Sequence, residues 1–213
     1  APQMGITLIS AIHSRWVIDL NRDPENKPLY SDGRIITGLC PTTNFLGESI
    51  YIDNRGAVDP ADVARRLKDY YWPYHSELTN LLQSLKSEFG QALIWDAHSI
   101  RAEVETIYKG RFPDLILGDV DESSATDSII GTAFKQLSSS SYSVSHNDPF
   151  KGGFITRSYG KPGNNQHALQ LEMSKINYMD DTETRYDQNR AEKMKTLLQT
   201  TLTALTALLT RKG

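Results

Sequence analysis

The chain has 213 residues, of which 38% are hydrophobic and 23% are charged, and its net charge is −3. This composition is typical of one globular domain and unlike that of nucleic-acid-binding domains, which are usually strongly basic. No apolar stretch approaches the roughly 18 residues that a membrane-spanning helix needs, and the single cysteine, Cys40, excludes an internal disulfide and a cysteine-rich zinc site.

The first quarter of the chain predicts strands followed by a long irregular region. Residues 6–20 are rich in Ile, Val and Leu with short polar interruptions, and we interpret them as one or two strands. Residues 21–34 are dense in Pro, Asn, Asp and Gly, which is typical of a loop. Residues 35–58 continue without a clear period.

A long helix is predicted next. Asp59 is a suitable N-cap, and Pro60 suits the first helical position. Apolar residues then recur at helical spacing as far as Phe89, after which Gly90 is a natural end. Pro73 lies inside this pattern, so we expect a kink there or a division into two helices.

The rest of the chain alternates between strands and helices. Apolar runs predict strands at 91–99, 113–119, 152–160 and 167–174. Helical spacing predicts helices at 123–137 and 186–211. We therefore expect a single α/β domain over residues 1–213, with three layers and a mixed, mostly parallel sheet. The single cysteine fits a reducing environment, so we expect the protein in the cytoplasm. We expect neither nucleic acid nor a membrane as a partner.

Polar side chains gather at three predicted strand ends, which is where open α/β sheets bind ligands. The clusters are Asp19, Asn21, Arg22 and Asp23; Asp96, His98 and Ser99; and His167, Gln170 and Glu172. Each cluster alone is a weak signal, but together they predict one site. The nucleophile elbow G-x-S-x-G and the phosphate-binding P-loop are both absent from the sequence.

His98 ends the apolar run QALIWDAHS and has two interpretations. A lone histidine beside a strand is more often a structural residue than a metal ligand. Asp96 precedes it by two residues, so both side chains point to the same side of an extended chain. Asp96 could orient a metal-binding histidine or bind the metal itself, which makes the two interpretations about equal.

Glu172 lies within the apolar segment LQLEM, where a buried carboxylate is costly unless it is paired or functional. It is either a solvent-exposed residue of an edge strand or a general base with a raised pKa that activates a water molecule. Gln170 would lie beside it on the same face.

Asn21 and Arg22 follow the first predicted strand. An arginine presents a planar, two-pronged donor to a carboxylate, although an ordinary surface role is favoured when the residue is considered alone. Arg157 follows Gly152 and Gly153, which allow close backbone approach. Arg157 could provide a second contact to an anionic ligand, and a purely structural role is about equally favoured.

Seven segments of the chain, in order, closely resemble the N-formylglutamate amidohydrolase (deformylase) family. They are HSRWVIDLNRDP (13–24), TGLCPTTNF (37–45), YYWPYHSEL (70–78), IWDAHSIR (94–101), GRFPDLILGD (110–119), PFKGGFITRSYGKP (149–162) and HALQLEMSKINYMDD (167–181). The resemblance implies hydrolysis of N-formyl-L-glutamate to formate and L-glutamate, late in histidine degradation. That family is similar in turn to zinc carboxypeptidases, so their phosphorylase/hydrolase-like fold is expected.

The resemblance also implies roles for the residues singled out above. His98 would bind zinc or another divalent metal at one site, and Glu172 would be the catalytic base. Substrate binding would fall to Asn21, Arg22 and Arg157. Strand alternation, apart from the resemblance, makes Asp96 and Gln170 possible supporting residues of this site.

One departure from the family concerns the start of the chain. The family usually has a first strand that ends in a His-Ala-Gly or His-Ser-Gly type motif, and nothing before His13 matches it. A catalytic zinc normally has three protein ligands, so we expect an incomplete metal site with poor zinc affinity and activity. A missing strand would also leave a sheet edge open and favour self-association.

Two alternatives stay open. The same residues would serve a deacylase of another N-acyl amino acid, with only the pocket shape changed. An inactive, truncated relative that binds a carboxylate ligand is the other, and bound metal would distinguish it from an enzyme. We expect His75 to be structural, and His146 and His167 are further candidates to reach the site from loops.

Overall fold

The computed structural model describes residues 2–30, 37–53 and 56–210, so the predicted loop at 21–34 and the irregular region at 35–58 lie partly outside the described residues. The α-helices are α1 (Pro60–Arg66), α2 (Trp72–Phe89), α3 (Asp127–Ser138), α4 (Phe154–Tyr159) and α5 (Gln188–Leu209). The strands are β1 (Ala92–Ile100), β2 (Leu115–Gly118), β3 (Val144–His146) and β4 (Gln166–Ser174). Single turns are η1 (Pro2–Met4), η3 (Pro162–Asn164) and η4 (Lys175–Asn177), and a π-helical segment, η2, spans Leu67–Tyr71.

The four strands form one mixed sheet in the order β1-β4-β2-β3. β1 is parallel to β4 and β2 is parallel to β3, whereas β2 and β4 are antiparallel. The predicted mixed, mostly parallel sheet is therefore confirmed. The short strand β3 follows the serine-rich residues 138–143. It was not predicted, because three residues are too few to show an alternation of apolar and polar side chains.

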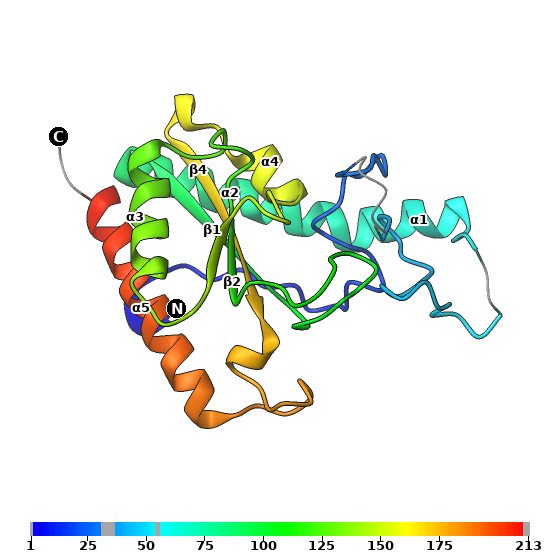
Figure 1. Ribbon diagram of the computed structural model, residues 1–213. Coiled ribbons are helices and arrows are strands. Elements are labelled where there is room, and N and C mark those ends of the chain that lie inside the picture. Colours follow the sequence, from blue (N-terminus) through cyan, green and yellow to red (C-terminus); the bar gives the residue numbers. More distant parts are fainter. Residues whose placement is uncertain (1, 31–36, 54–55, 211–213) are drawn as a thin grey trace.

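Helices cover both faces of the sheet, which confirms the three layers (Figure 1). On one face, Leu169 and Leu171 of β4 pack with apolar residues of α3 and α5 in the largest core cluster. On the other face, Leu78 and Leu82 of α2 pack on β1, together with Ile155 of α4. None of the helices in the described ranges is long and apolar enough to cross a lipid bilayer.

The predicted long helix is confirmed, but it adapts to its proline in an unexpected way. Asp59 caps α1 by accepting a hydrogen bond from the Ala61 N–H at 2.7 Å, and Gly90 ends α2 with a left-handed φ of 80°. Between α1 and α2 the chain forms η2, where the Trp72 N–H bonds the Leu67 carbonyl. Pro73 has no N–H to donate, and the wider π turn just before it accommodates this loss.

The prediction of strands at 6–20 is wrong, because the structure has none among these residues. The chain turns at residues 14–17, where the Val17 N–H donates to the Ser14 carbonyl at 2.9 Å. Ile18 then packs with Leu39 and Tyr71 in a small apolar cluster. The apolar residues of this segment therefore serve side-chain packing, without a strand ladder.

The prediction of a strand at 152–160 is also wrong, since most of this segment forms α4. Two side chains from elsewhere in the chain satisfy N–H groups at the start of this helix. The Gly153 N–H donates to Gln170 Oε1, and the Ile155 N–H donates to Asn21 Oδ1, both at 2.7 Å. These long-range bonds outweigh the strand preference of a segment rich in β-branched and aromatic residues.

Candidate active site

The register of β1 and β4 brings two of the predicted clusters together. In this parallel pair His98 lies opposite Glu172, and Asp96 lies opposite Gln170. Because side chains alternate along a strand, all four point to the face that α2 and α4 cover, away from Leu171 and the larger core. If the pairing of β1 with β4 shifted by one residue, His98 would no longer lie opposite Glu172, nor Asp96 opposite Gln170.

Asn21 joins this pair of strands to the loop before them. Its side-chain Nδ2 donates to Asp96 Oδ2 at 3.1 Å and lies 2.9 Å from His98 Nε2. Its Oδ1 accepts the Ile155 N–H at the start of α4. A Cβ on Gly153 would stand 2.5 Å from the Asn21 amide, so this approach requires glycine at that position. Asn21 therefore ties the loop to β1 and α4.

His98 and Asp96 form an ion pair, with His98 Nε2 at 2.9 Å from Asp96 Oδ1. The same nitrogen cannot donate to Asp96 and accept from Asn21 at one time, so the proton on His98 decides which contact is a hydrogen bond. Burial alone lowers the pKa of His98, but Asp96, and after it Glu172, raise this pKa to about 9. The protonated ring therefore bonds Asp96.

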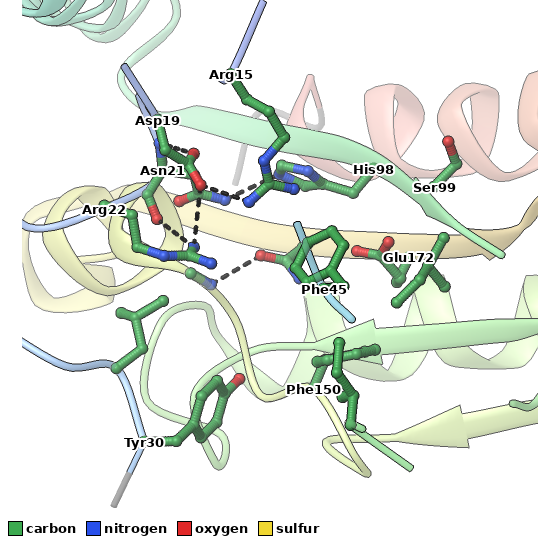
Figure 2. Close-up of a pocket in the computed structure, with 15 residues that line it drawn as sticks. Arg15, Asp19, Asn21, Arg22, Tyr30, Phe45, His98, Ser99, Phe150 and Glu172 are labelled. Atoms are coloured by element: carbon green, nitrogen blue, oxygen red, sulfur yellow. Dashed lines mark hydrogen bonds and ion pairs between the residues drawn. The ribbon is translucent and has the colours of Figure 1, made fainter. Parts of the chain in front are cut away.

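Glu172 is a carboxylate with no structural partner. None of the described residues forms a hydrogen bond with it, and burial raises its pKa to about 7, against the lowering effect of His98 and Arg15. Figure 2 shows Glu172 and Arg22 approaching the same space from opposite sides. A carboxyl group of this pKa exchanges a proton readily at neutral pH.

Arg15 and Arg22 supply positive charge to the space that Glu172 faces. Arg22 donates through Nε to the Thr37 carbonyl at 2.8 Å and through Nη1 to the Asn21 carbonyl at 3.0 Å. Buried Asp19 pairs with Arg15 and lies 3.6 Å from Arg22 Nη1. Burial lowers the pKa of Arg22, and Asp19 counteracts this effect.

The pocket between these groups is small, with a volume of about 110 Å³. Its polar lining is Arg15, Asp19, Asn21, Arg22, Tyr30, His98, Ser99, Gln170 and Glu172. Its other lining residues are Leu29, Phe45, Ile100, Ile107, Phe150 and Gly153. A second cavity of about 400 Å³ lies between residues 8–13 and β1, and His98 lines both spaces.

Arg15 is the residue that the sequence reasoning missed. It lies in the segment interpreted as a strand, where alternation gave it no special place. In the structure its guanidinium lies 5.1 Å from the Phe45 ring centre, and its buried Nε has no hydrogen-bond partner among the described residues. No local pattern in the sequence singles it out, because its position depends on the turn at residues 14–17.

The other residues considered in the sequence lie outside the pocket lining. Arg157 of α4 is exposed, donates through Nε to the Gly152 carbonyl at 3.0 Å, and stacks over Tyr30. His146 lies 2.6 Å from Asp119 through Nε2. His167 is buried and, by strand alternation, faces α3 and α5. The anion-binding role of Arg157 stays a prediction.

The donor groups near His98 bear on the expected metal site. The structure places His98 and Asp96 side by side, but within residues 2–30, 37–53 and 56–210 no three His, Cys, Asp or Glu side chains are grouped to hold a metal ion. A catalytic zinc needs three protein ligands. The described residues alone therefore do not fit such a site, and the metal stays a prediction.

Sequence comparison identifies relatives over nearly the whole chain. The chain is 37% identical over 211 residues to the N-formylglutamate deformylase of Pseudomonas putida, covering 97% of this chain and 77% of that protein. It is 38% identical over 210 residues to the N-formylglutamate deformylase of Pseudomonas aeruginosa, with the same coverage.

Structural comparison agrees with the sequence relatives. The crystal structure of N-formylglutamate amidohydrolase from Ralstonia eutropha superposes with a TM-score of 0.72 at 26% identity, covering 91% of this chain and 73% of that chain. A gene product of Agrobacterium tumefaciens shares the fold, with a TM-score of 0.63 at 18% identity. The sequence profile of the N-formylglutamate amidohydrolase family matches residues 1–179, and the chain belongs to that family.

Proposed function

We propose that this chain hydrolyses the formyl amide of N-formyl-L-glutamate, releasing formate and L-glutamate. The observation that carries the proposal is Glu172, a half-buried carboxylate in the pocket with a pKa of about 7 and no hydrogen-bond partner among the described residues. It faces Arg22 across the pocket. Membership of the amidohydrolase family supports the choice of substrate.

Arg22 suits the role of carboxylate anchor. A guanidinium has five N–H donors, and those of Arg22 bond the Thr37 carbonyl, the Thr37 hydroxyl and the Asn21 carbonyl. Two N–H groups are then left over from those three bonds, which is the number that a two-pronged bond to a substrate carboxylate needs. Asn21 holds the neighbouring Arg22 beside β1 and α4 through its own contacts with Asp96 and Ile155.

The reaction then proceeds with the chain's own groups. Ionised Glu172 takes a proton from a water molecule while the water oxygen attacks the formyl carbon. The carbonyl oxygen becomes negatively charged, and the positive charge of Arg15, which lines the pocket, is suited to stabilise it. Glu172 returns the proton to the amide nitrogen as the C–N bond breaks, which leaves formate and the free amine of glutamate.

We also propose one divalent metal, with zinc the first candidate, bound in part by His98. A bound metal would act as a Lewis acid, but no step above depends on it. Metal analysis of the purified protein, together with zinc titration of wild type and His98→Ala, tests this proposal. Loss of zinc affinity in the variant is expected. Equal affinity in both proteins, or no binding by wild type, would overturn it.

The same proposal places the reaction in histidine degradation in the cytoplasm. A strain that lacks this gene would then accumulate N-formyl-L-glutamate when it is fed histidine, and the absence of such accumulation would count against that place.

The decisive experiment measures formate and glutamate released from three substrates. N-formyl-L-glutamate should be cleaved. N-acetyl-L-glutamate tests the acyl pocket, and N-formyl-L-leucine removes the side-chain carboxylate. We expect the first substrate to have the highest kcat/KM because its acyl group is small and both its carboxylates are present. Equal turnover of the acetyl compound would instead indicate a general deacylase, and no formate from any of them would refute the function.

A further inference from the structure

The segment that carries Asn21 and Arg22 belongs to no strand, so no sheet ladder holds it in place. Side chains from the long helix bind its backbone on both sides of Asn21. The Tyr71 hydroxyl donates to the Arg22 carbonyl at 2.8 Å, and His75 Nε2 lies 3.0 Å from the Leu20 carbonyl. Two side chains one helical turn apart therefore hold the two carbonyls that flank Asn21.

The contacts of His75 determine its tautomer. A carbonyl oxygen only accepts, so His75 Nε2 must carry the hydrogen that bonds Leu20. Burial lowers the pKa of His75, so the ring is neutral and its Nδ1 is an acceptor. The Tyr159 hydroxyl lies 2.9 Å from Nδ1 and 3.3 Å from the His75 backbone carbonyl, so its one hydrogen is donated to an acceptor of His75 in either case. Tyr159 of α4 thereby bonds His75 of α2.

Packing leaves these rings little freedom to move. Tyr71 is fully buried and His75 is only 5% exposed. The ring centres of Tyr71 and His75 are 4.2 Å apart, and those of His75 and Tyr159 are 5.8 Å apart with planes inclined by 6°. Phe154 closes the cluster, with its ring centre 5.7 Å from that of His75.

We propose that Tyr71, His75 and Tyr159 are positioning residues that hold the segment of Asn21 and Arg22 in place, with Asn21 against Asp96 and His98 of β1. We call these three residues the aromatic clamp. They do not line the pocket, so their effect on a bound substrate would be transmitted only through the loop whose backbone they bond. The effect of the clamp on catalysis rests on the proposed function, whereas its effect on the loop does not.

The first test removes one hydroxyl from the clamp. Tyr71→Phe keeps the ring and loses the bond to the Arg22 carbonyl, so Arg22 should bind substrate less well. A net hydrogen bond of about 1 kcal/mol corresponds to a rise in KM of roughly fivefold. Tyr70→Phe is the matched control, because the neighbouring Tyr70 hydroxyl contacts only Arg65, at 3.5 Å, among the described residues.

KM distinguishes positioning from a general loss of structure. A variant that is merely less stable lowers the amount of active enzyme, and so the apparent kcat, but leaves KM unchanged. The coupling to Arg22 is tested by adding Tyr71→Phe to Arg22→Lys. If Tyr71 acts through Arg22, the second substitution should add little to the KM of the first.

The second test uses rescue at His75. His75→Phe keeps an aromatic ring but removes the donor to the Leu20 carbonyl, and KM should rise by roughly fivefold to tenfold. His75→Gln places an amide N–H near the position of Nε2 and should recover part of this loss. If Gln and Phe were equally impaired, the bond to Leu20 would not be the cause.

Hydrogen–deuterium exchange of the full chain gives a readout that needs no substrate. Amides of residues 15–24 should exchange faster in Tyr71→Phe and His75→Phe than in wild type, and Tyr70→Phe should match wild type. Unchanged exchange there would overturn the clamp, whether or not the enzyme cleaves N-formyl-L-glutamate. An inactive wild type with faster exchange in the variants would refute the function and leave the clamp supported.

Discussion

The two faces of β4 show how differently one strand serves stability and chemistry. On one face, Leu169 and Leu171 are completely buried among apolar side chains of α3 and α5. On the other, Gln170 and Glu172 alternate with them and face the pocket. The first face contributes free energy of folding through burial, whereas the second buries polar groups at a cost to it. Substitutions on the two faces should therefore have opposite effects.

The largest effect is expected from Glu172→Gln. This change keeps size and shape but removes the proton acceptor, so kcat should fall by roughly 10²- to 10⁴-fold. Formate release under saturating N-formyl-L-glutamate is the measurement. Near-normal turnover of the variant, with its fold intact by circular dichroism, would remove Glu172 from the mechanism.

On the opposite face, Leu169→Ala should act on stability alone. The side chain is fully buried, and its truncation leaves a cavity that costs about 3 to 5 kcal/mol of the free energy of unfolding. Urea unfolding measures this loss, and KM of the folded enzyme should stay at the wild-type value. A change in KM as large as that in stability would show that the two faces are not independent.

The pH dependence of the wild-type enzyme follows from the pKa of about 7 at Glu172. The base works only when ionised, so kcat/KM should rise with pH and level off above about 7, falling about tenfold per unit below it. A pH series of formate release tests this. A flat profile between pH 5 and 8 would assign the base to another group.

The smallest effect is a gain in stability in the variant that loses activity. The pKa of Glu172 is raised on folding, from 4.5 to about 7, so the native carboxyl holds a proton that the unfolded chain has released. Its contribution to stability is present below about pH 4.5 and is lost as the pH rises through about 7. Glu172→Gln should therefore exceed wild type in free energy of unfolding by about 1 to 3 kcal/mol at pH 8.

At pH 4.5 the two proteins should unfold at nearly the same urea concentration, which is the internal control for that comparison. An equal difference at both pH values would mean that packing, and not charge, separates glutamate from glutamine at this position.

Sequence patterns predicted the parts of the fold whose signal is local. The apolar run before His98, the helical spacing before Gly90 and the caps at Asp59 and Gly90 all correspond to observed elements. Residues 6–20 and 152–160 failed for one shared reason. Both are rich in residues that favour strands, but contacts with residues distant in sequence set their conformation. Ile18 packs with Leu39 and Tyr71, and Gln170 and Asn21 bond N–H groups at the start of α4.

The candidate site was predictable to a similar extent. Strand alternation placed Asp96 with His98 and Gln170 with Glu172, and the structure confirms that these side chains share one face. The roles assigned to them stay predictions. Arg15 could not be found, because its place in the pocket depends on a turn at residues 14–17 that the apolar pattern concealed.

The π-helical segment η2 determines the phase between the two halves of the long helix. Before it, Arg66 Nη1 donates to the Val17 carbonyl at 2.6 Å, and at its end Tyr71 bonds the Arg22 carbonyl. Straightening Leu67–Tyr71 into regular α-helix without changing its length would rotate the two halves by about 100° relative to each other, which is the turn of one residue. With the π turn in place, the long helix bonds both the Val17 carbonyl and the Arg22 carbonyl, at the two ends of the loop that carries Asn21.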